Sequence, residues 1–179
     1  MKTGSYAVIA ALGILLAIAL AYNATAIPAG WSDDLQVTNT TGWSEVPDVA
    51  VDASNNVHIV YAEEGMPFYA KISSGNLVLQ KNLTATSHGA FETGIAVDPL
   101  GRVHLVWQDS AKGNNLIYEQ LNDVGGVVVP PAQITFKRWA SMPDLAVDPN
   151  GNPSVVYGLP NNTGSVGYTK LDSIGKTVI

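Results

Sequence analysis

The chain has 179 residues and no cysteine, and only 13% of its residues are charged. Without cysteine it has no disulfide framework, no thiol nucleophile, no iron–sulfur cluster and no cysteine-ligated zinc. Its charged fraction is about half of the ~25% usual in soluble domains. Fifteen acidic side chains outnumber nine basic ones, which gives a formal net charge of −6. This balance excludes the basic surface that nucleic-acid binding requires and a polybasic segment for anionic lipid.

The N-terminal segment has the layout of an export signal. Lys2 is the one charged residue among the first 26, and an apolar or small stretch follows from Ala7 to Tyr22. Asn-Ala-Thr-Ala at residues 23–26 then supplies small residues for a cleavage site. The apolar run is shorter than the ~20 residues of a membrane-spanning helix. We therefore predict a signal peptide at residues 1–26 and a secreted or cell-surface protein, with a retained membrane anchor over the same residues as the alternative.

An internal repeat runs through the remaining residues, 27–179. Three segments of equal length align without a gap, and each has Ala-Val-Asp at the same place and an aromatic residue nine positions after the aspartate: 47–61, 93–107 and 143–157. The aspartates recur 46 and 50 residues apart, at Asp52, Asp98 and Asp148. Runs of β-branched residues flank turn sequences in each segment, which predicts strand, turn and strand.

Two further strands are expected in each repeat, before and after a turn that contains glycine. Four short strands per 46 to 50 residues are typical of a β-propeller blade. The strands are apolar on both faces, as expected for sheets packed between two neighbours. We therefore predict an all-β propeller domain with blades at about 43–88, 89–138 and 139–179.

The predicted ring is incomplete. The third repeat ends after its glycine turn and lacks a fourth strand, whereas residues 35–40 resemble the fourth strands of the other repeats. An N-terminal strand at 35–40 is therefore expected to complete a last blade. Propellers typically have about four to eight blades, so three hypotheses follow. Two chains exchange this strand and close a six-bladed ring, chains donate it in an open polymer, or further blades belong to a longer chain.

The pattern Ala-Val-Asp-x-x-Gly-x-Val-His-Leu-Val-Trp, which residues 96–107 contain in full, resembles the blade repeat of secreted bacterial and archaeal propeller proteins of the sialidase-like type. The resemblance covers about residues 35–179 and implies the architecture. It implies no catalytic residue, because the Ser-x-Asp-x-Gly-x-Thr-Trp box of sialidase blades is absent. Sialidases also hold the substrate carboxylate with three arginines, whereas this chain has only Arg102 and Arg138.

Aromatic and acidic residues in the connections between blades form the candidate binding site. Propellers usually bind ligands at the central opening, near which these connections emerge. Flat aromatic side chains there would stack on sugar rings, and carboxylates would fix the hydroxyls. The alternative is that the tryptophans wedge between blades. The predicted binding residues are Trp43, Glu45, Phe91, Glu92 and Trp139, and Glu45 and Glu92 are also the one carboxylate pair that we nominate for glycoside hydrolysis.

The repeated polar residues are predicted to be structural. Each aspartate of the repeat caps its turn, with calcium binding as the alternative; no other metal or cofactor is expected. His58 and His104 occupy one position in two repeats, which favours packing with a buried hydrogen bond over catalysis. Three Asn-x-Thr sequences are candidate glycosylation sites on an exported surface, at Asn39, Asn82 and Asn161.

The sequence therefore predicts an exported, non-enzymatic β-propeller module. Its expected role is to bind glycan or protein at the cell surface, or to act in structural assembly by self-association through N-terminal strand exchange. One alternative is a sialidase-like glycan hydrolase or a fragment of a larger propeller enzyme. Another is a pilin-like filament subunit that keeps its apolar N-terminal helix.

Overall fold

The computed structural model describes residues 32–84, 89–136, 139–159 and 164–179. The chain divides into two compact units, residues 1–36 and 37–179. The predicted signal segment at 1–26 and the sequon at Asn161 lie outside the described residues. In the described ranges, no helix is long and apolar enough to cross a membrane.

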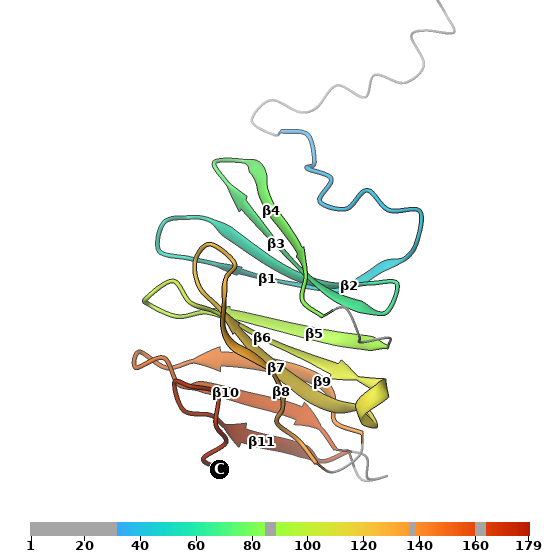
Figure 1. Ribbon diagram of the computed structural model, residues 1–179, viewed down its shortest axis with the longest axis vertical. Helices are drawn as coiled ribbons and strands as arrows, with labels where there is room; N and C mark the ends of the chain where they lie inside the picture. The colour runs from blue at the N-terminus through green and yellow to red at the C-terminus, as the bar shows by residue number, and fades with distance from the viewer. Residues whose placement is uncertain (1–31, 85–88, 137–138, 160–163) are drawn as a thin grey trace, which may run out of the picture. The chain divides into compact units, whose positions relative to one another are not determined.

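Residues 37–179 form an all-β unit of three antiparallel sheets. Within the described residues, two sheets have four strands and one has three. Figure 1 shows the sheets following one another in sequence order. The first sheet has the order β1 (Ser44–Val51), β2 (Val57–Glu63), β3 (Met66–Ser73) and β4 (Asn76–Asn82). Each strand therefore pairs with the strand before it, as the repeat predicts.

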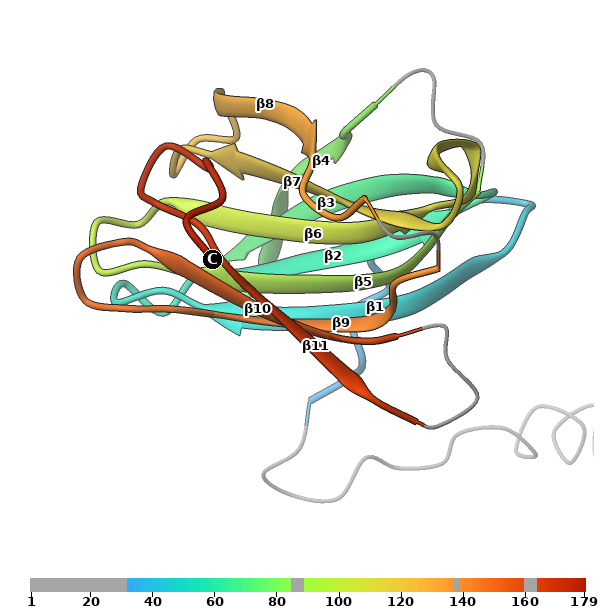
Figure 2. The same ribbon diagram turned by 90° about the horizontal axis from the view of Figure 1, so that it is seen from below.

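The second and third sheets repeat this meander. The second has the order β5 (Ala90–Val97), β6 (Val103–Asp109), β7 (Asn115–Leu121) and β8 (Val127–Gln133), with the 3₁₀ helix η1 (Ser110–Lys112) between β6 and β7. The third contains β9 (Ser141–Val147), β10 (Pro153–Gly158) and β11 (Val166–Lys170). The first strands of the sheets, β1, β5 and β9, contact one another in that order, and Figure 2 shows them side by side.

The repeated aspartates form the turns between the first two strands of each sheet. Asp52 Oδ1 accepts hydrogen bonds from the backbone N–H groups of Ser54 and Asn56, at 2.8 and 2.9 Å. The same pair of bonds recurs at the other two aspartates. A carboxylate that binds two amides within its own turn fixes a tight reversal of the chain. These bonds explain why Ala-Val-Asp marks the end of the first strand in every repeat.

Alternating side chains give each sheet two apolar faces. We call the face that packs on the next sheet along the chain the forward face, and the opposite one the backward face. In the first sheet, Val60 and Tyr69 belong to the forward face and pack in one core cluster with backward-face residues of the second sheet: Ile95, Leu105, Trp107 and Ile117. A second cluster joins Val106 and Tyr118 of the second sheet to the third: Leu145 and Val155, with Val147 and Tyr157 at its border.

The end of the chain agrees with the sequence-based expectation that the third sheet lacks a fourth strand, because this sheet contains three strands in the described residues. Thr177 forms an isolated β-bridge with Leu171. Val178 N–H donates to the carbonyl of Lys170 at 2.8 Å, and Lys170 N–H donates to the carbonyl of Ile179 at 3.1 Å. Residues 177–179 therefore lie beside the end of β11, because the glycine turn at 172–176 directs the chain back along it.

No strand is assigned to residues 35–40 in the structure of the single chain. A β-strand needs the unpaired edge of a neighbouring strand for its backbone hydrogen bonds. In the strand-exchange hypothesis that edge belongs to a second chain. The N-terminal strand and its exchange therefore stay predictions, and Lys170, the last residue of β11, is already hydrogen-bonded to Val178 and Ile179.

Candidate functional site

The first strand of each sheet has a β-bulge near its start. The bulged residues Val46, Glu92 and Met142 have positive φ angles of 47°, 50° and 47°. They are spaced by 46 and 50 residues, as the aspartates are. A positive φ is costly for a non-glycine residue, most of all for a β-branched valine, and persists only where the surroundings enforce it. The repeat therefore encodes a strained bulge at one end of all three sheets.

Side chains connect these bulges from one sheet to the next. Thr93 Oγ1 donates to the carbonyl of Val46, and the backbone N–H of Met142 donates to the carboxylate of Glu92. Because its carboxylate accepts this bond, Glu92 has a structural contact at the bulge. Glu45, the other carboxylate of the pair nominated for hydrolysis, is exposed.

The predicted aromatic residues are accessible at this end of the sheets. Trp43 is 83% exposed, Trp139 is 58% exposed, and Phe91 is also exposed. Trp139 lines a hollow of the second sheet, whereas Glu45 lines a separate apolar hollow on the first sheet, beside Val37 and Tyr61. The structure therefore divides the predicted residues between different surfaces and does not gather them around one ligand.

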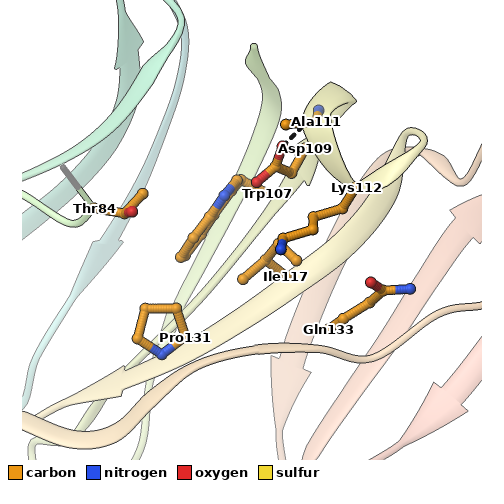
Figure 3. A pocket seen from close by; sticks show the side chains of 8 residues that line it. All are labelled: Thr84, Trp107, Asp109, Ala111, Lys112, Ile117, Pro131 and Gln133. Carbon is orange, nitrogen blue, oxygen red and sulfur yellow. Dashed lines mark hydrogen bonds between the residues drawn. The ribbon is translucent and has the colours of Figure 1, made fainter. Parts of the chain in front are cut away.

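Two hollows flank the η1 loop of the second sheet, and the first was not predicted from the sequence. It has a volume of about 450 Å³ and lies against the backward face of the second sheet. Figure 3 shows the indole of Trp107 along one side of it, with Lys112 and Ile117 opposite. The full lining comprises Thr84, Trp107, Asp109, Ala111, Lys112, Ile117, Pro131 and Gln133.

Asp109 positions the η1 loop at the edge of this pocket. Its carboxylate accepts a hydrogen bond from Ala111 N–H at 2.8 Å and so caps the start of η1 (Figure 3). Gly113 ends the helix in the left-handed conformation, with φ 74°. The helix thereby presents Lys112 to the pocket, beside the aromatic wall.

The second hollow, of about 540 Å³, lies on the other side of the loop and shares Lys112 with the first. The exposed side chains of Phe136 and Trp139 line it, together with Gly113, Asn114 and Asn115. Trp139 has a φ of 74°, and its N–H donates to the carbonyl of Gly113 at 3.2 Å. The loop of the second sheet therefore fixes the backbone of an exposed, strained tryptophan next to an ammonium group and two amides.

The histidines of the repeat are buried between the sheets. His104 contacts Tyr118 Oη through Nδ1 at 2.8 Å and Asp98 Oδ2 through Nε2 at 3.4 Å. His58 makes the same two contacts in the first sheet, with Tyr69 and Asp52. Burial lowers the pKa of His104, and the hydrogen bond to Asp98 offsets this effect only in part. The imidazole is therefore neutral near pH 7 and acts in packing.

The aspartates of these triads stay ionised. Burial by itself would raise the pKa of Asp98, but hydrogen bonds from Arg102, His104 and Leu100 outweigh it, so the pKa is lowered. The pKa of Asp52 is lowered for the same reason by Asn56, His58 and Ser54. In the described part of the chain, no three His, Asp or Glu side chains gather as a metal-ion site would require. Calcium binding by the turns therefore stays a hypothesis without a ligand set.

Glu119 is a buried acid that the sequence did not single out. It lies on the backward face of the second sheet, opposite Leu105, and is fully buried. Within the described structure neither carboxylate oxygen has a hydrogen-bond partner. Burial raises the pKa of Glu119 to about 7, against a lowering effect of the charge on Lys81.

Of the glycosylation candidates, Asn39 is exposed. Asn82 is half-buried, and its side-chain oxygen accepts a hydrogen bond from the backbone N–H of Thr84 at 2.9 Å. Its amide therefore stabilises the end of β4.

Consecutive antiparallel meanders, packed face to face with their first strands adjacent, define a propeller-like fold. The solved structures that share it include two enzymes. A Hadza microbial sialidase aligns with a TM-score of 0.54 and 11% sequence identity, covering 75% of this chain and 36% of the sialidase. An exo-β-1,3-galactanase from Clostridium thermocellum aligns with a TM-score of 0.50 and 14% identity, covering 74% of this chain and 34% of the galactanase.

At these identities the similarity establishes the fold alone. The chain spans about a third of the length of either enzyme. No model of a protein family matches the sequence, and no curated protein matches it either.

Proposed function

We propose that this chain is an exported, non-enzymatic β-propeller module that binds glycans at the η1 loop of its second sheet. The observation that carries the proposal is the hollow formed by Phe136, Trp139 and Lys112. Aromatic faces that project from a rigid sheet stack on the apolar faces of sugar rings. The Lys112 ammonium and the amide of Asn114 would bind hydroxyl or carboxylate groups at the ring edges.

Binding is favoured over cleavage by the chemistry of the two hollows. Glycoside hydrolysis usually requires two carboxyl groups on either side of the scissile bond. Asp109 is the one carboxylate in the pocket of Figure 3, and it already caps η1. In the nominated pair, Glu92 accepts a backbone hydrogen bond and Glu45 lines a different hollow.

Substitution of Trp139 by alanine is expected to weaken glycan binding about five- to thirtyfold, because stacking on an exposed aromatic contributes on the order of 1–2 kcal/mol. Lys112→Ala should weaken binding of acidic glycans more than that of neutral ones. Both side chains line the hollow from its surface, so the thermal unfolding temperature should stay within about 2 °C. Binding is measured on a glycan array and then by isothermal titration calorimetry with the best ligands.

Trp43→Ala is the matched control, because Trp43 is an exposed tryptophan outside this hollow. It should bind as the unmodified chain does. Equal losses in both tryptophan variants, or no glycan bound by the unmodified chain, would contradict the proposal. Release of sugar from a bound glycan that is lost in Glu45→Gln or Glu92→Gln would favour the hydrolase alternative instead.

Export is the second part of this proposal. Its support is the sequence of residues 1–26, with one lysine before the apolar stretch and small residues at its end. We expect the mature protein to begin at Ile27 when the gene is expressed in a secreting host. N-terminal sequencing checks this, and an N-terminus at Met1 in the membrane fraction would favour the anchor or the pilin-like alternative.

A further inference from the structure

Each end of the row of sheets has an apolar face with exposed residues. On the backward face of the first sheet, Val49 is 58% exposed and Val51 is 59% exposed, whereas Tyr61 on the same face is buried and lines a hollow with Val37. On the forward face of the third sheet, Val156 is 41% exposed and Tyr168 is 48% exposed. Two open faces of β-branched and aromatic residues are unusual on a soluble domain and mark interaction surfaces.

The corresponding faces of the other sheets show what such faces contact. Val49 corresponds to Ile95 in the second sheet and Leu145 in the third, and these two residues are buried against the forward face of the preceding sheet. Val156 and Tyr168 pair across β10 and β11, as Val106 and Tyr118 pair across β6 and β7. At both internal junctions a forward face therefore packs on a backward face, and one face of each kind is left over.

The glycine turn that follows the third strand of each sheet provides a second, independent correspondence between the sheets. A Cβ atom built on Gly125 would lie 3.9 Å from Tyr69 Cε1 of the preceding sheet, and one built on Gly175 would lie 2.8 Å from Tyr118 Cε1. The turn of each following sheet thus rests on the repeated tyrosine of the sheet before it. Around the corresponding Gly75 of the first sheet there is nothing within 4 Å, and Tyr168 is the repeated tyrosine without a turn above it.

A lysine side chain also contacts the glycine turn of the following sheet. Lys71 pairs with His58 across β2 and β3, and its ammonium donates to the carbonyl of Asp123, in the glycine turn of the next sheet, at 2.8 Å. Lys170 pairs with Ser154 in the same register of the third sheet. Its ammonium forms an ion pair with Asp148 of the same sheet at 3.7 Å, and its register places it beside the Gly75 turn of a following sheet.

We propose that the uncovered forward face of the third sheet docks on the uncovered backward face of the first sheet of a second copy of this chain, and the reverse, so that two copies close a ring of six sheets. The occupant is a second copy because its first sheet supplies the backward face and the glycine turn that Tyr168 and Lys170 match. Six sheets lie within the range of about four to eight that close a propeller. The contact extends the two junctions within the chain and is independent of glycan binding.

The chain, purified after export, should be a stable dimer by size-exclusion chromatography with light scattering and by sedimentation velocity. Val49→Asp and Tyr168→Asp each place a charge at one of the two faces. Each should raise the dimer dissociation constant at least about tenfold, because a carboxylate buried in an apolar contact costs more than 1.4 kcal/mol. Leu100→Asp, at an exposed apolar residue in the β5–β6 turn, is the matched control and should leave the dimer intact.

Mixing the two face variants tests the head-to-tail arrangement. Val49→Asp keeps an intact forward face and Tyr168→Asp keeps an intact backward face, so the mixture should form mixed dimers through one junction although neither variant dimerises alone. If the contact joined two backward faces, Tyr168→Asp would dimerise as the unmodified chain does. That result, a monomeric unmodified chain, or polymers that grow without limit would overturn the closed ring. Circular dichroism of each variant confirms that it is folded.

Discussion

Replacement of His104 by alanine is expected to lower the free energy of unfolding by about 3 kcal/mol. The imidazole is fully buried and contacts both the carboxylate of Asp98 and the hydroxyl of Tyr118. Its removal leaves the buried hydroxyl without this partner and opens a cavity between the second and third sheets. Each of these effects costs on the order of 1–2 kcal/mol. Urea denaturation monitored by tryptophan fluorescence, at fixed protein concentration, measures the change.

The repeat supplies the control for this experiment. Ser154 occupies the position of His104 in the third sheet and contacts Tyr168 Oη at 3.2 Å, but this pair is exposed. At a protein concentration at which the chain is monomeric, Ser154→Ala should therefore change the free energy of unfolding by less than about 0.5 kcal/mol. Equal effects at the two positions would show that burial does not decide the contribution of this contact.

Glu119→Gln is expected to stabilise the protein at pH 8 by up to about 3 kcal/mol. The folded chain raises the pKa of Glu119 from 4.5 to about 7, because burial between the first and second sheets penalises the charged carboxylate. Between these two pH values the folded state binds a proton that the unfolded state has released. Folding stability contributed by the protonated acid is therefore present below pH 4.5 and is lost as the pH rises to about 7. Glutamine keeps the shape and cannot ionise.

The pH dependence separates this effect from ordinary changes in packing. At pH 4 Glu119 is protonated in the folded state and largely so in the unfolded state, so the variant and the unmodified chain should have similar stabilities. The difference should grow from pH 4.5 and level off above pH 7. Glu45→Gln, at an exposed glutamate, should show no such growth. A constant difference across this range would contradict the assignment of the raised pKa to Glu119.

Much of the fold could be predicted from the sequence because the repeat is locally encoded. Asp52 and its two counterparts bind amides within their own turns, so the reversal after each first strand depends on neighbours in sequence. The alternation of apolar residues on both faces likewise predicted sheets packed between other sheets.

The candidate site was less predictable. Trp43, Phe91 and Trp139 were expected at the connections between blades; all three are accessible, but Phe91 lies in β5. Their separation, and the grouping of Trp139 with Phe136 and Lys112, depend on how the η1 loop lies on the second sheet. The burial of Glu119 could not be predicted either. A glutamate at such an alternating position is also typical of a strand with one face exposed to solvent.

The sequence by itself determined where the strands and turns lie and which side chains share a face, since both follow from contacts within one repeat. Only the tertiary structure decided which of those faces are buried, because burial depends on whether a neighbouring sheet is present. Tyr118 and Tyr168 show the difference. They occupy the same place in two repeats, yet the third sheet covers Tyr118 completely, whereas Tyr168 is about half exposed at the end of the row.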